Sequence, residues 1–537
     1  MGQPGFPSSP ESALARVDVR LVPAALTCWA VTAAGIWWPV GRSLALCGVA
    51  LVAVSGALAC HAGRRCGRTA RLRAISAGLA AIGVAGAGFG FAIALRADAV
   101  GRHPITAAFG TAIPVTVTPT ESAVSVGSGS RGRLMFRATL QRAGADEMSG
   151  RVVVFAPASD FSDLMVGQPM RFTARINRPT RRDLTVAVLI ASGRPAMGTA
   201  NAVQRAAHTV RRRFALAVRD ALPVDQATML PALVLGDTSA VAAETGRDFR
   251  AAGLTHLMAV SGANVTIVCA AVLFSARLLG PRAAVVLAAL ALVAFVVVVQ
   301  PTASVLRAAV MGAIALAGML SSRRRQAIPA LSATVLVLFA VAPQLAVDVG
   351  FALSVLATAA LVVVAPVWSR RLVARGWPKP LADAVAVAWA AHLVTAPLVA
   401  GISGRVSLVA VAANLAAAPV IAPITVLGSG AAALCLLWPA GGQLLIRFTG
   451  PELWWVVHVA RWAANVPVAT VPVPAGVPGV LVVGGLTVLV CLLARPLWRW
   501  RGFRVALRLA GAGLVVCLLA WSLSEYFGSH TGSVGRA

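Results

Sequence analysis

The sequence predicts a polytopic α-helical membrane protein into which one small β-domain is inserted. Of its 537 residues, 58% are hydrophobic and only 12% are charged, whereas a soluble domain carries about a quarter of charged residues. Apolar runs of about 20 residues, the length that crosses a bilayer as a helix, recur along the chain. A single region of different texture, residues 97–198, interrupts them. We expect roughly 10–13 spans, re-entrant helices included.

The N-terminal part predicts a tail and three membrane helices. Residues 1–20 form the tail, and residues 21–96 hold apolar spans near 21–40, 43–60 and 74–95. The loop between the second and third spans, HAGRRCGRTARLR, is rich in arginine. Such loops face the cytoplasm, so the third span delivers the following residues to the outside.

Residues 97–198 predict the β-domain. They contain short alternating runs separated by Gly, Pro, Asp and Ser clusters: IPVTVTP, RLMFRATLQRA, GRVVVFAP, PMRFTARI and LTVAVLIASG. This pattern is typical of about five antiparallel strands. The length and strand number fit an extracytoplasmic small β-barrel of the OB-like type.

The remainder predicts a connector, a membrane core and a tail. Residues 199–253 predict an amphipathic helical connector whose stretch 199–222 has a basic face, and residues 523–537 form the C-terminal tail. Residues 254–522 predict the core, with spans near 254–276, 283–299, 304–320, 327–343, 349–368, 381–403, 405–437, 478–494 and 504–522.

The arginine-rich loops of the core predict its topology. The loops at Arg277 with Arg282, Arg323–Arg325, Arg370–Lys379 and Arg495–Arg504 should all face the cytoplasm. The count of spans allows this if 405–437 is a re-entrant or hairpin pair, which Pro419 and Pro423 favour as helix breakers. We expect residues 443–465 to lie flat at the outer interface, and the C-terminus to lie outside.

Composition also bears on partners and cofactors. The net charge is +29, from 47 basic and 18 acidic residues. Arginine in cytoplasmic loops explains part of this excess, and the remainder in the polar region around the β-domain suits a polyanion. The eight cysteines lie mostly in apolar spans. They indicate neither a disulfide framework nor a CxxC metal site, and we expect no cofactor.

The stretch from Leu235 to Ile267, LGDTSAVAAETGRDFRAAGLTHLMAVSGANVTI, is the most informative part of the chain. It carries polar side chains into an apolar helix, where each uncompensated polar group costs several kcal/mol. The Gly236–Asp237 pair, the run Phe249 to Gly262 and the following Ala263–Asn264 resemble the core signature of the ComEC proteins, a family of bacterial competence proteins that take up DNA.

Three further stretches resemble the same family in order and spacing. They are PTASVLRAAVMG (Pro301–Gly312), DVGFALSVLAT (Asp348–Thr358) and VSLVAVAANLAAAPV (Val406–Val420). The resemblance implies an OB-like domain before the channel core and a channel that passes single-stranded DNA through the bacterial cytoplasmic membrane during natural transformation. Many members also end in a metallo-β-lactamase-like domain with an HxHxDH motif. This sequence has no HxH, so we expect the form without that domain and no enzymatic activity.

Several residues are candidates for a substrate path in the core: His256, Ser261, Asn264, Arg307, Asp348 and Asn414. Arg307 is the strongest, because a guanidinium inside an apolar helix needs an acid, carbonyl groups or a water-filled cavity. Snorkelling of Arg307 to the interface is the alternative. Asp348 is its plausible counter-ion, although it could equally cap a helix. For His256 and Asn264 the alternatives are bonds to the backbone and between helices.

Two other groups are candidates outside the spans. Asp237, Asp248 and Arg250 should form a salt-bridged collar at the channel mouth. Five arginines of the β-domain could follow a phosphate backbone: Arg133, Arg137, Arg171, Arg175 and Arg178. Solvated charge without a ligand is the alternative for both groups.

The leading functional prediction is therefore a channel for single-stranded DNA. The expected partners are single-stranded DNA, membrane lipids, an external DNA receptor and a cytoplasmic DNA-translocating ATPase, since the sequence holds no P-loop of its own. A transporter or exporter of another polar or lipid-linked envelope substrate would show the same polar residues. A membrane-embedded enzyme would need a convergent acid, base or metal cluster, which the sequence does not indicate.

Overall fold

The computed structural model describes residues 18–64, 69–126, 132–161, 164–320 and 326–499. Its elements divide into two compact units, residues 1–394 with 407–470 and residues 395–406 with 471–537. Within the described residues, eight helical segments are long and apolar enough to cross a membrane: Gly41–Cys60, Ile75–Ala108, Gly262–Leu279, Pro281–Val299, Ala303–Leu320, Val349–Val373, Lys379–Ser403 and Ala410–Leu437. This confirms the polytopic membrane fold, and the span expected at 504–522 lies outside the described residues.

Three helices precede the β-domain: α1 (Val22–Trp37), α2 (Gly41–Arg64) and α3 (Thr69–Gly101). Glycine brings α2 and α3 together. A Cβ added at Gly48 would lie 2.4 Å from the backbone nitrogen of Ala87, and one at Gly90 would lie 2.8 Å from that of Ala45. Small residues allow helix backbones to approach closely in a membrane, where packing replaces the hydrophobic effect.

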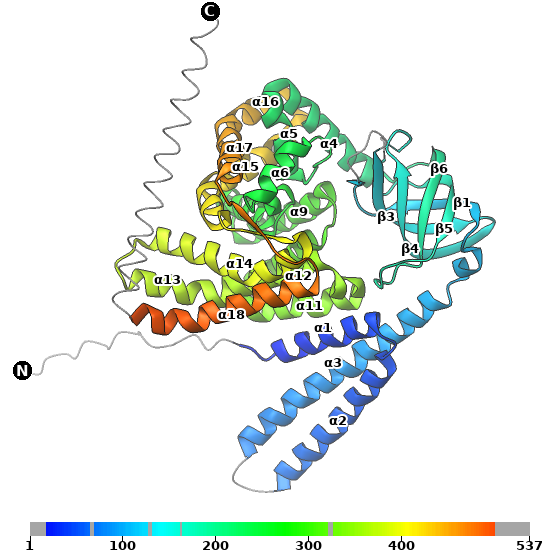
Figure 1. Ribbon diagram of the computed structural model, residues 1–537, viewed down its shortest axis with the longest axis vertical. Helices are drawn as coiled ribbons and strands as arrows, with labels where there is room; N and C mark the ends of the chain where they lie inside the picture. Colours follow the sequence, from blue (N-terminus) through cyan, green and yellow to red (C-terminus); the bar gives the residue numbers. More distant parts are fainter. Residues whose placement is uncertain (1–17, 65–68, 127–131, 162–163, 321–325, 500–537) are drawn as a thin grey trace, which may run out of the picture. The chain divides into compact units, whose positions relative to one another are not determined.

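The β-domain contains a short 3₁₀ helix, η1 (Pro104–Ala108), and six strands: β1 (Ala112–Pro119), β2 (Val124–Val126), β3 (Arg133–Ala143), β4 (Asp146–Pro157), β5 (Met170–Asn177) and β6 (Ala187–Met197). β1 pairs antiparallel with both β3 and β5. β3 pairs with β4, β5 pairs with β6, and β4 with β6 closes the ring in parallel. Five strands therefore form the closed barrel that the alternating runs predicted (Figure 1), with the strand connections of an OB-like fold.

Alternation along the strands places the core of the barrel. On β1, Val115 and Val117 point inward and are almost fully buried. Three phenylalanines, Phe136, Phe161 and Phe172, pack against one another at the centre, with ring centroids 5.3 and 6.3 Å apart. Because successive side chains of a strand face opposite sides, the arginines between these apolar positions lie on the outer surface.

The helical core begins after the barrel with α4 (Ala202–Ala221), the predicted amphipathic helix. It continues with α5 (Val224–Leu235), α6 (Ala243–Ala251), α7 (Thr255–Met258), α8 (Gly262–Ser275), η2 (Ala276–Leu279), α9 (Pro281–Val299), α10 (Ala303–Leu320), α11 (Ala327–Val341) and η3 (Pro343–Val347). The sequence prediction missed α5, a short apolar helix whose residues Met229–Leu235 are buried.

The second half of the core contains α12 (Val349–Ala359), a π-helical turn (Ala360–Val364), α13 (Ala365–Val373), α14 (Lys379–Ser403), α15 (Ala410–Leu437), α16 (Pro439–Phe448) and α17 (Gly450–Asn465). After α14 comes β7 (Arg405–Ser407), which pairs with β8 (Thr470–Pro472), and α18 (Val477–Arg499) follows β8. In the second unit, Gly401 of α14 approaches α18, since a Cβ there would lie 2.5 Å from a methyl group of Val480.

The expected break in 405–437 is wrong. α15 is continuous through Pro419 and Pro423. A proline frees carbonyl groups in the preceding turn, and here the indole nitrogen of Trp455 in α17 donates to the carbonyl oxygen of Ala416 at 2.8 Å. The hydroxyl of Thr425 also donates to the carbonyl of Ile421. The bond from Trp455 thus ties α17 to α15 in the turn before Pro419.

Residues 443–465, which we expect to lie flat at the outer interface, form the end of α16 and all of α17. α16 and α17 both pack along α15, and Leu453, Val456 and Ala460 of α17 are fully buried. The chain then returns to the start of α15, where the amide of Leu408 donates to the carbonyl of Ala469 at 2.9 Å. Residues 438–469 therefore retrace the length of α15, about 42 Å at 1.5 Å per residue.

Cysteine cross-linking tests this return. In a cysteine-free background, Leu408→Cys with Ala469→Cys should form a disulfide on mild oxidation, because disulfides require Cα atoms within about 7 Å. The matched pair Leu437→Cys with Ala469→Cys, at the other end of α15, should not. A cross-link in the second pair and none in the first, measured by gel mobility, would contradict the antiparallel return.

Candidate functional site

The Gly236–Asp237 pair forms the turn that ends α5. Gly236 has φ of +70° and its amide bonds to the carbonyl of Ala232, which closes the helix. Glycine adopts this left-handed conformation without steric cost. Asp237 follows and accepts hydrogen bonds from the backbone and hydroxyl of Ser239. The turn therefore directs the Asp237 carboxylate toward α4.

Arg211 of α4 lies at the centre of this region. Its Nη1 donates to the carbonyl oxygens of Leu235 at 3.2 Å, Val298 at 3.2 Å and Val299 at 3.4 Å. Its Nη2 lies 3.5 Å from Asp237, and its side chain is 11% exposed. The last carbonyls of a helix lack partners inside the helix and carry partial negative charge. One guanidinium thus satisfies the carboxyl ends of both α5 and α9.

Burial lowers the pKa of Arg211, and the Asp237 carboxylate opposes that effect. Burial also lowers the pKa of the nearby His208, with the positive charges of Arg212 and Arg211 acting in the same direction. Asp237 thus offsets part of the effect of burial on the charge of Arg211.

The run Phe249 to Gly262 wraps against α15. Phe249 is fully buried. Gly253 has φ of +71° and a Cβ there would lie 2.5 Å from Ala410, so only glycine allows this approach. The side chain of Asn414 in α15 donates to the carbonyl of Gly253 at 3.5 Å and to that of Ala410 at 2.7 Å. Ser407 donates to the carbonyl of Ala251 at 2.7 Å.

Asn264 ties the signature helix α8 to α5. It is 4% exposed. Its side-chain amide donates to the carbonyl of Leu233 at 2.9 Å, and its oxygen accepts from the hydroxyl of Ser261 at 3.2 Å. A buried polar group with both ends satisfied fixes how two helices meet.

Arg307 of α10 is buried, with 6% of its surface exposed. Its Nε donates to the hydroxyl of Ser354 in α12 at 2.8 Å, and that hydroxyl lies 3.2 Å from Ser304. Nη1 contacts the Met311 sulfur at 3.3 Å. A Cβ at Gly262 would lie 2.6 Å from Nη2, so the guanidinium rests against the glycine of the signature. We call Gly262, Ser304, Arg307 and Ser354 the polar junction.

The polar junction brings together three of the four motif stretches. Gly262 belongs to the signature, Arg307 and Ser304 to the stretch after Pro301, and Ser354 to the stretch after Asp348. The fourth stretch reaches the signature through Asn414 and Gly253. Among the described residues, no carboxylate lies within 4 Å of the Arg307 guanidinium. Its polar contacts are the uncharged Ser354 hydroxyl and Met311 sulfur.

The expected pairing of Arg307 with Asp348 is not formed. Asp348 caps α12 by accepting from the amide of Phe351 at 2.8 Å, and its other oxygen lies 3.9 Å from Arg137. An aspartate directly before a helix satisfies the first amides of that helix, which turns its carboxylate away from α10.

The expected collar at the channel mouth is also not formed. Asp237 pairs with Arg211 instead, and Arg250 folds back to donate to the carbonyl of Gly246 at 2.9 Å. Asp248 and Arg250 stand two residues apart in α6, and such residues point to different sides of a helix. Burial and the charge of Glu244 raise the pKa of Asp248, against Arg461 and Arg247.

The other candidates have simpler surroundings. The side chain of His256 on α7 is exposed. On the barrel, Arg133, Arg171, Arg175 and Arg178 are exposed, while Arg137 is half-buried. Arg178 lies over the ring of Phe109, 5.6 Å from its centroid, and Arg137 pairs with Glu121 at 3.1 Å.

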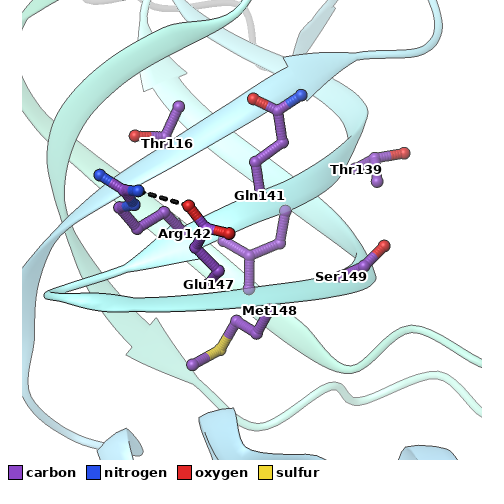
Figure 2. Close-up of a pocket in the computed structure, with 8 residues that line it drawn as sticks. Thr116, Thr139, Gln141, Arg142, Glu147, Met148 and Ser149 are labelled. Atoms are coloured by element: carbon purple, nitrogen blue, oxygen red, sulfur yellow. Dashed lines mark hydrogen bonds and ion pairs between the residues drawn. The ribbon is translucent and has the colours of Figure 1, made fainter.

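The barrel also has an open polar groove at the end of the β3–β4 hairpin (Figure 2). It is lined by Thr116, Thr139, Leu140, Gln141, Arg142, Glu147, Met148 and Ser149. The register of β3 against β4 shifts between Leu140 and Arg142, so Gln141 is an extra residue there. Arg142 bonds to Glu147 across the groove, which leaves its charge balanced. Within the described ranges, no group of three or more His, Cys, Asp or Glu side chains could hold a metal ion.

Sequence reasoning missed Arg211, Ser304 and Ser354 as site residues. Ser304 and Ser354 stood inside the motif stretches quoted above and could have been named with Arg307. Arg211 gave no signal of its own, because it is one of several arginines on the basic face of α4.

Comparisons with known proteins indicate the family of this chain. A family model described as Competence protein matches residues 233–500, which span all four motif stretches. The chain belongs to the ComEC family of competence proteins. It is a multi-pass protein of the cytoplasmic membrane.

One curated relative of this ComEC-family chain is ComE operon protein 3 of Bacillus subtilis (strain 168), 25% identical over 289 residues. The match covers 53% of this chain and 36% of the relative, so the chain spans only about a third of the relative's length. No solved structure matches the chain.

Replacing Arg211 should destabilise the core. Arg211→Gln leaves the Asp237 carboxylate and three helix-end carbonyls without their cation, and breaking a buried ion pair costs about 3 kcal/mol. We expect a clear drop in the unfolding temperature of the purified protein. Arg212→Gln, an exposed neighbour on the same helix, should leave it unchanged. Equal unfolding temperatures for the two variants would contradict the role of Arg211.

Asp248→Asn should have the opposite effect and stabilise the protein. The raised pKa of Asp248 means that the folded state disfavours its charge, so ionised Asp248 reduces stability above its unfolded pKa of about 3.9. Removing the charge should raise the unfolding temperature at pH 7, and the gain should disappear as pH falls below that value. A loss of stability at pH 7 would show that Asp248 has a stabilising partner.

Proposed function

We propose that this chain forms the membrane passage through which single-stranded DNA enters the cell during natural transformation. The polar junction carries the proposal: three motif stretches of the family meet at Arg307, a buried guanidinium with no acidic partner among the described residues. Family membership supports a role in competence, and the proposal assigns that role to this junction.

The chemistry of the junction suits a phosphate. An unpaired cation in an apolar setting is costly, and the binding of an anion would offset that cost. Arg307 offers a guanidinium fork, which matches phosphate geometry, and Ser304 and Ser354 add hydroxyl donors beside it. A phosphate that reaches this point exchanges its water for these donors, as ions do in selective channels.

The protein is then one part of a larger pathway. We propose that an external receptor presents the strand and that a cytoplasmic ATPase draws it inward, because the sequence has no P-loop. The chain itself supplies the passage.

Substitution of Arg307 tests the passage directly. Arg307→Ala should abolish uptake of labelled DNA while the protein is still made and inserted, and Arg307→Lys should retain a fraction, because it keeps the charge and loses the fork. The matched control is Arg277→Gln. Arg277 is exposed, lies over the ring of Phe274 and stands in η2, directly after α8. It should transport normally.

A double substitution separates this role from simple ion pairing. Because Asp348 contacts Arg137 and the start of α12, Asp348→Ala should not restore uptake to the Arg307→Ala protein. Full uptake by Arg307→Ala alone would refute the phosphate role. Loss of uptake only in variants that also fail to insert would reduce Arg307 to a structural residue.

A further inference from the structure

The barrel has two outer faces that carry arginines. The first, which we call the β3–β4 face, bears Arg137 and Arg151 on neighbouring strands. The second, the β1–β5–β6 face, bears Arg171 and Arg175 on β5. In OB folds the usual ligand surface lies on strands two and three, which correspond to β3 and β4 here. The charges around the two faces differ.

On the β3–β4 face, Arg137 is already balanced by carboxylates, whereas Arg133 at the start of β3 is exposed. Arg137 lies 3.1 Å from Glu121 and 3.9 Å from Asp348. Burial opposes its charge, but Glu121, Asp348 and Asp183 outweigh that effect and raise its pKa. Burial lowers the pKa of Arg151, and the charge of Arg137 lowers it further. A phosphate approaching Arg137 would therefore also meet the carboxylates of Glu121 and Asp348.

On the β1–β5–β6 face, Arg194 of β6 lies 3.9 Å from Asp160, but the two arginines of β5 are unbalanced. Arg171 and Arg175 are exposed, and within the part of the chain that the structure describes neither forms an ion pair. They stand four residues apart on one side of β5, about 13 Å at 3.3 Å per residue. The sequences of β1, β5 and β6 contain no Asp or Glu.

The neighbours of Arg171 are small, since it stands between Thr116 of β1 and Ala196 of β6. Arg175 stands between Ala112 of β1 and Ile190 of β6, which is 37% exposed. No aromatic side chain faces outward here, because Phe172 of β5 points inward and is 4% exposed. A surface of this kind can neutralise phosphates but cannot stack bases.

We propose that the β1–β5–β6 face binds the sugar–phosphate backbone of single-stranded DNA without reading its bases, and that the β3–β4 face does not bind DNA. This inference rests on the proposed function and adds which surface of the barrel first holds the strand. Two consequences follow. An abasic strand binds as tightly as a normal one, and affinity falls steeply with salt.

The test uses the purified full-length protein in a neutral detergent with a fluorescein-labelled 20-residue thymidine strand. Arg171→Gln with Arg175→Gln should weaken binding about tenfold at low salt and lower the slope of affinity against salt by about 1 to 2. The matched control, Arg133→Gln with Arg142→Gln, removes the same charge from exposed positions of β3 and should leave both values near those of the unchanged protein. Equal unfolding temperatures show that both variants fold.

The outcomes separate the inference from the proposed function. If the unchanged protein binds no strand at low salt, the proposal that the chain carries DNA fails. If it binds but only the control variant loses affinity, the assignment of the face is overturned. An abasic strand that binds tenfold more weakly would show base stacking and also overturn it. If the Arg171 and Arg175 variant keeps its DNA affinity and instead loses binding to phosphatidylglycerol vesicles, the face contacts lipid rather than DNA.

Discussion

The rest of the core depends on the hydrogen bonds of the Arg211 guanidinium. This group lies between the carboxyl ends of α5 and α9. Its bonds to Leu235, Val298 and Val299 satisfy carbonyls that no helix could satisfy for itself. Asp237 holds the guanidinium there, and Gly236 provides the turn that brings Asp237 to it. α5 then offers the Leu233 carbonyl to Asn264, which sets the start of α8. The glycine that follows Ser261 in α8 is the surface against which Arg307 rests.

Much of this architecture could be predicted from local patterns. Alternating apolar residues gave the barrel strands, and apolar runs gave the helices, because both signals depend only on neighbouring residues. The motif stretches alone indicate Arg307 as a site residue. Contacts over long sequence separations could not be predicted in the same way. The parallel pairing of β4 with β6 that closes the barrel is one example, and the hydrogen bond from Trp455 of α17 to α15 is another.

The errors at the site have equally specific causes. Asp348 could serve as a counter-ion or as a helix cap, and only the structure shows that the Phe351 amide takes it. The collar combined Asp248 and Arg250, which a helix directs to different sides. Arg211 was hidden among the other arginines of α4, because the sequence does not say which of them faces two helix ends. The partners of Asp348 and Arg250 are local, in α12 and α6, whereas those of Arg211 lie at the ends of two other helices.

The central claim is that a DNA strand passes the polar junction, and a cross-link to a strand in transit tests it most directly. Ser304→Cys places a thiol one turn from Arg307, beside Ser354. Leu290→Cys places one on the exposed side of α9. A single-stranded DNA carrying a thiol-reactive group on its backbone, stalled during uptake by a bulky end, should label the Ser304→Cys protein and spare the Leu290→Cys protein. Equal labelling of both, or labelling of Leu290→Cys alone, would contradict a passage at Arg307.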